Sequence, residues 1–394
     1  MSRLNDLIKE LCPNGVEYKK LEDCCNILDN KRKPVSKGAR ENGEYPYYGA
    51  NGIQDYINDY IFDGEYVLVG EDGSVQTANS TPVVNWAVGK IWVNNHAHII
   101  EEIDGISLRY LYHYLQIVDV KDLIHGNIPK LNQGVFRNIK IAIPPLEVQE
   151  EIVKILDKFC ELEAELEAEL EARKSQYEFW RGILFKQDID KMVTLETIGD
   201  VTKLAGFEFS EYVNYSDDGN IIALRGLNVK NGHLVLDDVK YVDNSDFSKL
   251  NRSKLYENDI LYTYVGTVGQ VGLVDKNDKY YLAPNVARIR IFDEKVNPKY
   301  VMHYLLTNEF KTNQLDALSG TSSMKNITMT NIRKFKIPVP SLEKQNRIVN
   351  ILDKFDKLVN DISVGLPAEI ELRRQQYEYY RNKLLSFEEL SVSE

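Results

Sequence analysis

The sequence predicts an α+β protein built from two tandem α/β globular domains, each followed by a long helix. The repeat in the chain carries this prediction: residues 143–159 read IPPLEVQEEIVKILDKF and residues 339–355 read VPSLEKQNRIVNILDKF, with 11 identities in 17 positions. A second block, residues 171–185, returns at 371–385 with 7 identities in 15. A period of this length is far too long for a solenoid, so it indicates a duplicated two-part module with an internal pseudo-twofold.

The repeated blocks predict long helices over residues 147–185 and 343–385. Prolines stand just before each block, as expected where an extended segment gives way to a helix. Apolar residues then recur at alternating steps of three and four, which is typical of a helix that pairs along a seam. Gly365 and Pro367 predict a kink or restart in the second helix. The residues expected to pair the helices or to bind a partner are Ile152, Leu156, Phe159, Leu166, Leu170, Tyr177, Trp180, Leu184, Ile348, Leu352, Phe355, Ile362, Tyr377, Tyr380 and Leu384.

The segments outside these helices predict two globular domains, residues 1–146 and 186–342, and an acidic tail over 386–394. Both domains alternate short strand-like runs with Gly, Asn and Asp turns, and both carry one clear helix before the proline stretch. Residues 109–115 and 299–305 form a weaker echo of each other. We therefore expect one fold for both domains, with strongly diverged surfaces.

The composition leaves the class of partner open. The chain of 394 residues has 48 basic and 60 acidic side chains, a net charge of −12. Nine of the twelve excess negative charges lie in residues 147–185 and in the tail, so the two globular domains are nearly neutral. Charge therefore neither indicates nor excludes binding to DNA, which needs only a local basic face.

Several classes of protein are disfavoured by what the sequence lacks. It has no apolar run of about 18 residues and a polar start, which predicts a cytoplasmic protein. It has no phosphate-binding G-x-x-x-x-G-K-[ST] loop and no recognisable catalytic set, so neither catalysis nor a cofactor is expected. The four cysteines suggest packing residues. His96 and His98 could imitate a metal pair, but no third ligand stands nearby, so no metal is expected.

Three segments of the first domain complete a family resemblance: YPYYGANGI (45–53), FDGEYVLVGEDG (62–73) and NNHAHII (94–100). Together with the tandem helices, they make the chain resemble the specificity subunit of type I restriction–modification systems over essentially its whole length. The resemblance implies two target recognition domains, each reading one half of an asymmetric bipartite site in double-stranded DNA. It further implies an antiparallel coiled coil that docks two methyltransferase subunits, with restriction subunits joining the full complex in a prokaryotic cytoplasm. In such a complex the subunit itself catalyses nothing.

Candidate DNA contacts are basic and amide side chains near turns. Arg and Lys can place phosphates, and Asn or Gln can bond an adenine edge. For each, an ordinary surface or core role is the alternative. Residues 126–133 and 320–328 are both polar loops between a helix and a proline stretch, which favours them as paired DNA-facing loops. The candidates are Lys31, Arg32, Lys33, Lys37, Arg40, Tyr47, Tyr48, Asn51, Lys130, Asn132, Gln133, Arg225, Asn228, Lys230, Arg252, Lys254, Ser322, Ser323, Lys325, Asn326 and Thr328.

Two other functions remain open at this point. The chain could be a degenerate protein derived from a DNA methyltransferase, which would bind S-adenosylmethionine. It could also be a non-catalytic coiled-coil scaffold that binds only proteins. The two diverged globular domains favour the DNA-reading function, because a spacer has no use for two different reading heads.

Overall fold

In the computed structural model, the contacts between residues divide the chain into two compact units. Unit 1 comprises Met1–Glu167 with Glu369–Glu394, and unit 2 comprises Ala168–Ala368. Each unit therefore contains one globular domain and parts of both long helical segments, so the units cut across the order of segments along the chain. The structure describes residues 2–73, 75–124, 129–186, 192–204, 211–318 and 326–390.

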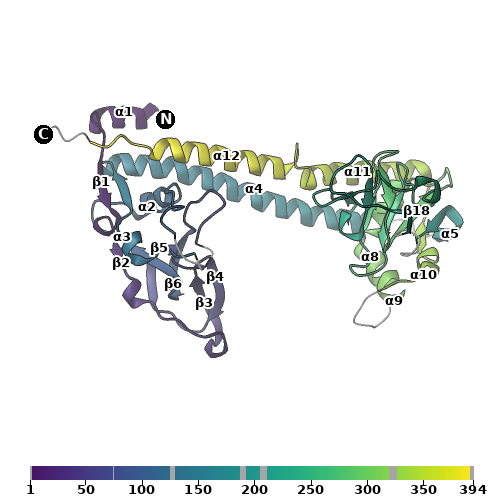
Figure 1. Cartoon of the computed structure of the whole chain (residues 1–394), viewed down its shortest axis with the longest axis horizontal. Coiled ribbons are helices and arrows are strands. Elements are labelled where there is room, and N and C mark those ends of the chain that lie inside the picture. Colours follow the sequence, from purple (N-terminus) through teal and green to yellow (C-terminus); the bar gives the residue numbers. More distant parts are fainter. Residues whose placement is uncertain are drawn as a thin grey trace. The chain divides into compact units, whose positions relative to one another are not determined.

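Unit 1 is built on a six-stranded sheet of order β2-β7-β5-β6-β3-β4 (Figure 1). The central strand β5 runs antiparallel to both neighbours, and Val67, Leu68 and Val69 in it are fully buried. Val67 and Val69 join one core cluster and Leu68 joins another, because successive side chains of a strand point to opposite faces. The elements are α1 Ser2–Leu11, β1 Glu17–Lys20, β2 Asn26–Ile27, β3 Asn42–Gly49, β4 Gly52–Ile57, β5 Phe62–Gly70, β6 Val84–Val93, β7 Ala97–Glu101, α2 Leu108–Leu115, α3 Gln133–Arg137 and β8 Lys140–Ile143.

Unit 2 contains two smaller sheets, of order β10-β18-β15-β16 and β14-β11-β17. In the first, β15 pairs antiparallel with β18, as β5 pairs with β7 in unit 1. The elements are β9 Met192–Thr194, α5 Leu195–Ile198, β10 Gly199–Thr202, β11 Ile222–Leu224, β12 Val229–Lys230, β13 His233–Leu234, β14 Lys240–Tyr241, β15 Ile260–Thr263, β16 Val271–Leu273, β17 Tyr280–Leu282, β18 Val286–Ile291, α7 Pro298–Leu305, α8 Asn308–Phe310, α9 Asp316–Leu318, α10 Met329–Arg333 and β19 Lys336–Pro338.

The long helices lie where the repeat predicts them. They are α4 Leu146–Lys186, α11 Leu342–Asn360 and α12 Leu366–Leu385. The second helical segment is interrupted between Asn360 and Leu366, which confirms the break predicted from Gly365 and Pro367. Pro367 falls in the first turn of α12, where its missing N–H costs no hydrogen bond. Ile362 lies in the interruption and is 84% exposed, so its predicted place in the helix seam is wrong.

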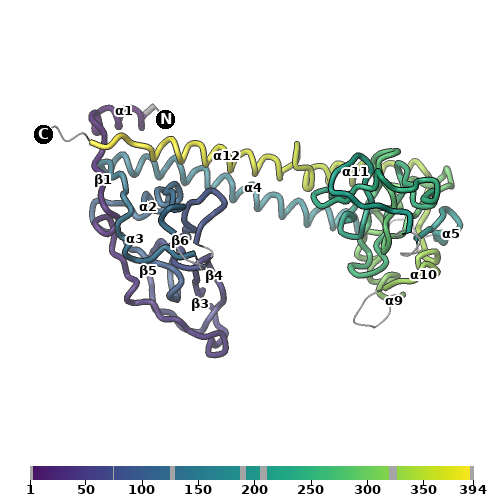
Figure 2. The backbone as a smooth tube through the Cα atoms, in the orientation of Figure 1, coloured from purple at the N-terminus to yellow at the C-terminus, as the bar shows by residue number. Residues whose placement is uncertain are grey.

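In unit 1 the first half of α4 pairs with α12, which lies alongside it in the backbone trace (Figure 2). The Phe159 ring stacks on the Tyr380 ring at 5.4 Å between centroids. Arg374 bonds both Glu163 and Glu167. Residues later in α4 thus meet residues earlier in α12, so the two helices are antiparallel. Ile152 and Leu156, both fully buried, point from this pair into the core of the unit.

In unit 2 the second half of α4 pairs with α11. Tyr177 stacks on Phe355 at 6.0 Å, and its hydroxyl lies 3.4 Å from Asp356. Ile348 and Leu352 belong to the same core cluster, and Leu170 and Leu184 pack against it. Each globular domain is therefore completed by the helix block that follows it in sequence and by the other block of the opposite repeat.

A buried glutamine fixes the start of each long helix against its own domain. Gln149 is fully buried; its Oε1 accepts from the Ser107 N–H at 3.0 Å and its Nε2 donates to the Pro144 carbonyl at 2.8 Å. Gln345, its counterpart in the repeat, bonds the Asn297 N–H and the Pro340 carbonyl, both at 2.8 Å. Both ends of each amide are thus satisfied by backbone groups, as buried polar groups require.

We predict that Gln149→Leu and Gln345→Leu each destabilise one unit. The substitution keeps the side-chain volume but leaves a buried N–H and carbonyl unpaired, a loss of roughly 2–4 kcal/mol. Hydrogen exchange read on peptides of each unit should show faster opening only in the unit that carries the change. The exposed Gln375→Leu is the control, and equal protection in all three variants would contradict this role for the buried glutamines.

Candidate functional site

Polar loops meet the same strand end in both units. In unit 1, Lys130 forms a β-bridge with Asp72 just beyond β5, and the Leu131 N–H donates to the Glu71 carbonyl at 2.8 Å. In unit 2, Asn326 forms the corresponding bridge with Val265 just beyond β15. The described ends of the two loops predicted as a pair, at Lys130 and Asn326, therefore occupy equivalent places. Ser322, Ser323 and Lys325 lie outside the described residues.

Two of the predicted contacts in these loops start helices. The Asn132 side chain accepts from the Val135 N–H and begins α3, and the Thr328 hydroxyl accepts from the Asn331 N–H and begins α10. Both residues are exposed. Their side-chain oxygens are committed to satisfying the free amides of a helix N-terminus, so we assign them a role in holding the loops.

The basic loop of unit 1 divides into exposed lysines and a buried arginine. Lys31, Lys33 and Lys37 are exposed. Arg32 instead points inward, where its Nη1 donates to Glu71 Oε2 at 2.7 Å and to the Ala97 carbonyl at 2.6 Å. Its guanidinium therefore holds the interior of the domain together, and no local signal in the sequence separates it from its neighbours.

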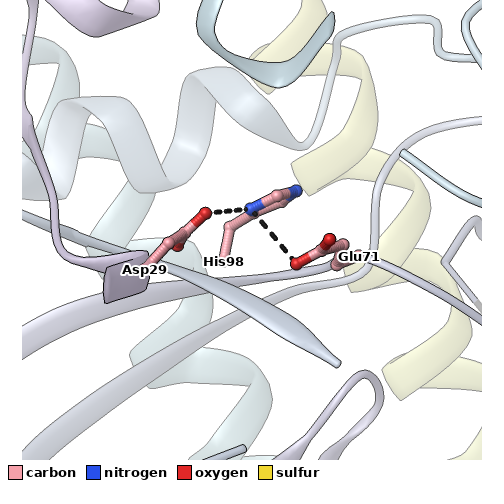
Figure 3. Close-up of side chains that lie close together, drawn as sticks. All are labelled: Asp29, Glu71 and His98. Atoms are coloured by element: carbon pink, nitrogen blue, oxygen red, sulfur yellow. Dashed lines mark hydrogen bonds and ion pairs between the residues drawn. The ribbon is translucent and has the colours of Figure 1, made fainter. Parts of the chain in front are cut away.

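Arg32 belongs to a buried ionic network centred on Asp29, Glu71 and His98 (Figure 3). His98 is fully buried; its Nδ1 lies 2.7 Å from Asp29 Oδ2 and its Nε2 lies 2.8 Å from the Leu131 carbonyl oxygen. Both partners can only accept, so each is satisfied by a ring nitrogen that carries a proton. The guanidinium of Arg32 adds positive charge between the two carboxylates, since its nitrogens lie 2.7 Å from Glu71 and 3.5 Å from Asp29.

The same network reaches the predicted contact loop at Lys130 and Gln133, in addition to the basic loop that carries Arg32. Lys130 Nζ lies 3.2 Å from Glu71 Oε1, and Gln133 Nε2 donates to Asp29 Oδ2 at 3.0 Å. The ligand atoms of Asp29, Glu71 and His98 have a spacing that could hold a metal ion. Because Arg32 and His98 already neutralise these carboxylates, the arrangement is better described as an ion-pair network that positions the loops. His96, the other histidine of the expected pair, is exposed and bonds Asp72.

The network holds Asp29 in its charged form. Burial by itself raises the pKa of Asp29, but the hydrogen bond and charge of His98, the charge of Arg32 and the Ile99 N–H outweigh it. The net result is a pKa of Asp29 below its ordinary value.

The aromatic part of the predicted contact set needs correction. Tyr47 and Tyr48 are buried, at 1% and 8% exposure, because β3 is paired on both sides, by β4 and by β6. Arg40 covers the Tyr47 ring at 4.1 Å and lies 3.3 Å from Asp55. Asn51, the amide that follows these tyrosines in the turn between β3 and β4, is exposed.

An exposed aromatic group that the sequence did not single out lies on the same sheet. Tyr56 is 52% exposed and Tyr60 is 37% exposed. The Lys90 ammonium lies 4.6 Å from the centroid of the Tyr60 ring. Strand alternation along β4 could have indicated Tyr56, because it alternates with the buried Ile57.

The predicted contacts of unit 2 also divide into buried or ion-paired residues and exposed residues. Asn228 is fully buried and bonds the Val235 and Asp238 carbonyls, which corrects its expected place at the surface. Arg225 bonds Asp238 at 2.8 Å, and Lys254 lies 2.6 Å from Asp278. Lys230 and Arg252 are exposed. These last two are therefore the cations of this set most available to a ligand.

The paired helices carry equivalent exposed aromatic groups. In unit 1 a groove of about 480 Å³ is lined by Ile155, Phe159, Leu162 and Tyr380, together with the side chains of two lysines. Tyr379, next to Tyr380, is 59% exposed. The repeat places Trp180 at the position of Tyr380. In unit 2, Phe179 is 62% exposed, Trp180 39% and Leu358 37%. Such exposed apolar side chains at corresponding positions are typical of binding surfaces. We call them the unit 1 patch and the unit 2 patch.

Comparison with known proteins gives a consistent result. A family model described as type I restriction modification DNA specificity domain matches residues 13–172 and again 191–372. The chain is 37% identical to a putative type I restriction enzyme specificity subunit of Haemophilus influenzae, over 97% of this chain and 98% of that one. It is 32% identical to a type I restriction enzyme specificity subunit of Escherichia coli, over 71% of each.

Solved structures share the fold. The S subunit of a type I restriction–modification system from M. genitalium superposes with a TM-score of 0.54 at 13% identity, covering 94% of this chain and 96% of that one. A chain from a study of complex assembly in the type I system gives 0.57 at 15% identity, covering 95% and 98%. Among the described residues, no helix has the length and apolarity to cross a membrane.

We predict that Asp29→Asn weakens unit 1 and flattens its response to acid. Because the pKa of Asp29 is lowered in the folded state, its stabilisation is complete above the unfolded value near 3.9 and is lost as the pH falls through the folded pKa. Breaking the pair at neutral pH should cost on the order of 3 kcal/mol. Urea unfolding between about pH 3 and pH 7 measures both effects. An acid response as steep as that of the wild type would refute the assignment.

Proposed function

The chain belongs to the family of type I restriction–modification DNA specificity subunits, and from this premise we propose that it selects the DNA sequences on which its partner subunits act. Each of the two matched domains reads one half of an asymmetric, bipartite site in double-stranded DNA. The helices join the two domains and dock the methyltransferase subunits, and the restriction subunits complete the assembly. The chemistry belongs to those partners, and this chain contributes neither catalysis nor a cofactor. Its place is the prokaryotic cytoplasm.

The observation that carries the proposal is one framework bearing two different surfaces. Gln149 and Gln345 make the same bonds, and the loops at Lys130 and Asn326 bridge to the same strand end. The side chains beside those strand ends differ: on β7 of unit 1 the residue opposite Val69 is the ion-paired His98, whereas on β18 of unit 2 the residue opposite Tyr262, at the matching place, is Ala287. Two domains with the same framework can bind duplex DNA in the same orientation. Loops with different side chains can then read different half-sites.

We assign phosphate contact to the exposed cations and base contact to exposed amides. In the first domain these are Lys31, Lys33, Lys37, Lys130 and Asn51, and in the second Lys230, Arg252 and Asn326, with Ser322, Ser323 and Lys325 proposed on the sequence alone. Other candidates hold these contact residues in place. Arg32 and Gln133 do so through the ionic network, and Asn132 and Thr328 do so as helix caps. Arg40, Arg225 and Lys254 do so through ion pairs.

Two methyltransferase subunits fit the duplicated patches. The unit 1 patch and the unit 2 patch derive from the same repeated helix blocks, so one partner surface can recognise both. Aromatic residues supply large contact areas, as they do at the centres of protein interfaces. We therefore propose one methyltransferase subunit on each patch.

The function is tested by long-read methylation sequencing of cells that carry the methyltransferase partner with or without this chain. We expect a gapped, two-part methylated motif only when the chain is present. Asn51→Ala should relax base preference in one half of that motif and leave the other half unchanged, because the residue belongs to a single domain. An assembled complex that adds no new motif would contradict DNA selection by this chain and favour a scaffold.

The phosphate contacts are tested with the triple variant Lys31→Ala, Lys33→Ala and Lys37→Ala in the assembled complex. Each lost contact should lower the slope of log affinity against log salt by roughly 0.9, for every DNA sequence alike. The control is Lys140→Ala, an exposed lysine on β8 beside Glu389. Fluorescence anisotropy across a salt series gives the slopes, and an unchanged slope in the triple variant would remove these lysines from the interface.

The docking proposal is tested by native mass spectrometry of the complex. Tyr380→Asp should remove one methyltransferase copy, Trp180→Asp the other, and the double variant both, because a buried unpaired carboxylate is strongly unfavourable. Val88→Asp, at a position 58% exposed on β6, is the matched control. Retention of both copies in the double variant would place the docking surfaces elsewhere.

A further inference from the structure

Unit 2 contains a cleft of about 550 Å³ between α11, α7 and the β13–β16 region; its lining includes no residue of the unit 2 patch and none assigned to DNA, although Asn231 beside Lys230 is part of it. Its wall carries four carboxylates, Glu257, Asp275, Asp353 and Asp356, against one lysine, Lys299, and two histidines. Leu234, Val274 and Met302 supply an apolar side. A negatively charged cleft with an apolar wall selects for a weakly hydrated cation.

One buried acceptor in this cleft has no partner. His303 is 2% exposed, and its Nε2 lies 3.1 Å from Asp353 Oδ1. Burial lowers the pKa of His303 below its ordinary value, although Asp353 opposes the shift. The neutral ring then donates from Nε2, which leaves a lone pair on Nδ1, and Nδ1 has no hydrogen-bond partner among the residues that the structure describes. A buried polar atom without a partner calls for an explanation, and a bound donor supplies one.

The corresponding place in unit 1 is closed. There His113 Nδ1 bonds the Tyr377 hydroxyl at 2.9 Å, and His113 Nε2 lies 2.8 Å from Asp157. In unit 2 the counterpart of Tyr377 is Tyr177, which lines the cleft but directs its hydroxyl to Asp356. The same histidine is therefore satisfied within the chain in one unit and left with an open nitrogen in the other.

In unit 1 the carboxylate that corresponds to Asp353 binds a guanidinium. Asp157 accepts from the guanidinium of Arg109 at 2.8 Å, and that guanidinium lies over the rings of Trp86 and Tyr112, at 4.8 and 4.5 Å from their centroids. The repeat aligns Arg109 with Lys299, whose ammonium lies 2.8 Å from Asp353, and Tyr112 with Met302, so unit 2 has an ammonium in place of the guanidinium and no ring in place of Tyr112.

Unit 2 gains a second carboxylate at the same point. The repeat aligns Cys160 with Asp356, which lies 3.0 Å from His233 Nε2. Compared with unit 1, the cleft has therefore lost an internal guanidinium and an aromatic cover and has gained an acid. With Lys299 and a protonated His233 counted, the four carboxylates still leave an excess of negative charge.

We propose that this cleft binds a guanidinium group brought by another molecule, an arginine side chain of a docked partner protein being the source. The guanidinium supplies a donor for His303 Nδ1, a positive charge for the carboxylate of Asp356, and an apolar face that suits the Met302 side of the cleft. The binding chemistry goes beyond the proposed function, and only the assignment of its source rests on that function.

The test titrates the full chain with ethylguanidinium and follows its histidine ring signals by nitrogen-15 NMR. Saturable shifts of His303 and His233 are expected, and tetramethylammonium, which has no N–H donor, should cause none. Asp356→Asn should weaken binding at least tenfold, about 1.4 kcal/mol. Met302→Tyr should bind at least as tightly as the wild type, because the Tyr112 ring at the matching place of unit 1 lies over a guanidinium. Cys160→Ser, at the matching position of unit 1, should bind as the wild type does.

Thermal melts confirm that each variant is folded. No saturable shift in the wild-type chain, or wild-type affinity in Asp356→Asn, would overturn the proposal. Repeating the titration on the assembled methyltransferase complex identifies the source: a partner arginine should already fill the cleft and block the probe. Binding to the complex with undiminished affinity would instead assign the cleft to a free guanidinium compound. The free-chain titration does not depend on DNA reading, so its failure is distinguishable from failure of the proposed function.

Discussion

Each unit depends on the antiparallel pairing of helix blocks from the two repeats. The core of unit 1 includes Tyr377, Leu384 and Leu385 from α12, which lie more than 200 residues from most of that domain. The core of unit 2 includes Tyr177 and Phe185 from α4, the helix that begins in unit 1. Neither globular domain has a closed core from its own repeat alone. Folding of either unit therefore requires both repeats, which explains why the helix blocks stayed alike while the domains diverged.

The division between constant and variable parts follows from this constraint. Residues that join a domain to its helices must satisfy the same partner in both units, so Gln149 and Gln345 repeat their bonds almost exactly. Loops at the free strand ends carry no such requirement. In unit 1 they contact the network of Asp29, His98 and Glu71, whereas in unit 2 Ala287 occupies the position of His98 on the matching strand. A specificity subunit needs this arrangement, because its docking must be constant and its reading surfaces must differ.

Small substitutions within the shared framework have large local consequences. Cys160 and Asp356 occupy one place in the repeat, as do Tyr112 and Met302. In unit 1 these residues accompany a closed site in which Asp157 holds Arg109 beneath two aromatic rings. In unit 2 they accompany an open, acidic cleft with an unpartnered histidine nitrogen. Comparing the two units at matching positions therefore shows which residues differ and how the site changes with them.

The sequence by itself determined the duplicated plan, the long helices, the break near Gly365 and the equivalence of the loops at Lys130 and Asn326. These follow from local periodicity and from identities between repeats, which the chain records directly. Only the tertiary structure decided that Arg32, Tyr47 and Asn228 face inward while Lys31, Asn51 and Lys230 remain at the surface. The physical reason is that burial depends on partners far away in sequence, such as Glu71 for Arg32 and β6 for Tyr47. Residue type and local spacing do not record those contacts, so a run such as 31–33 reads as uniformly basic although its middle member belongs to the core.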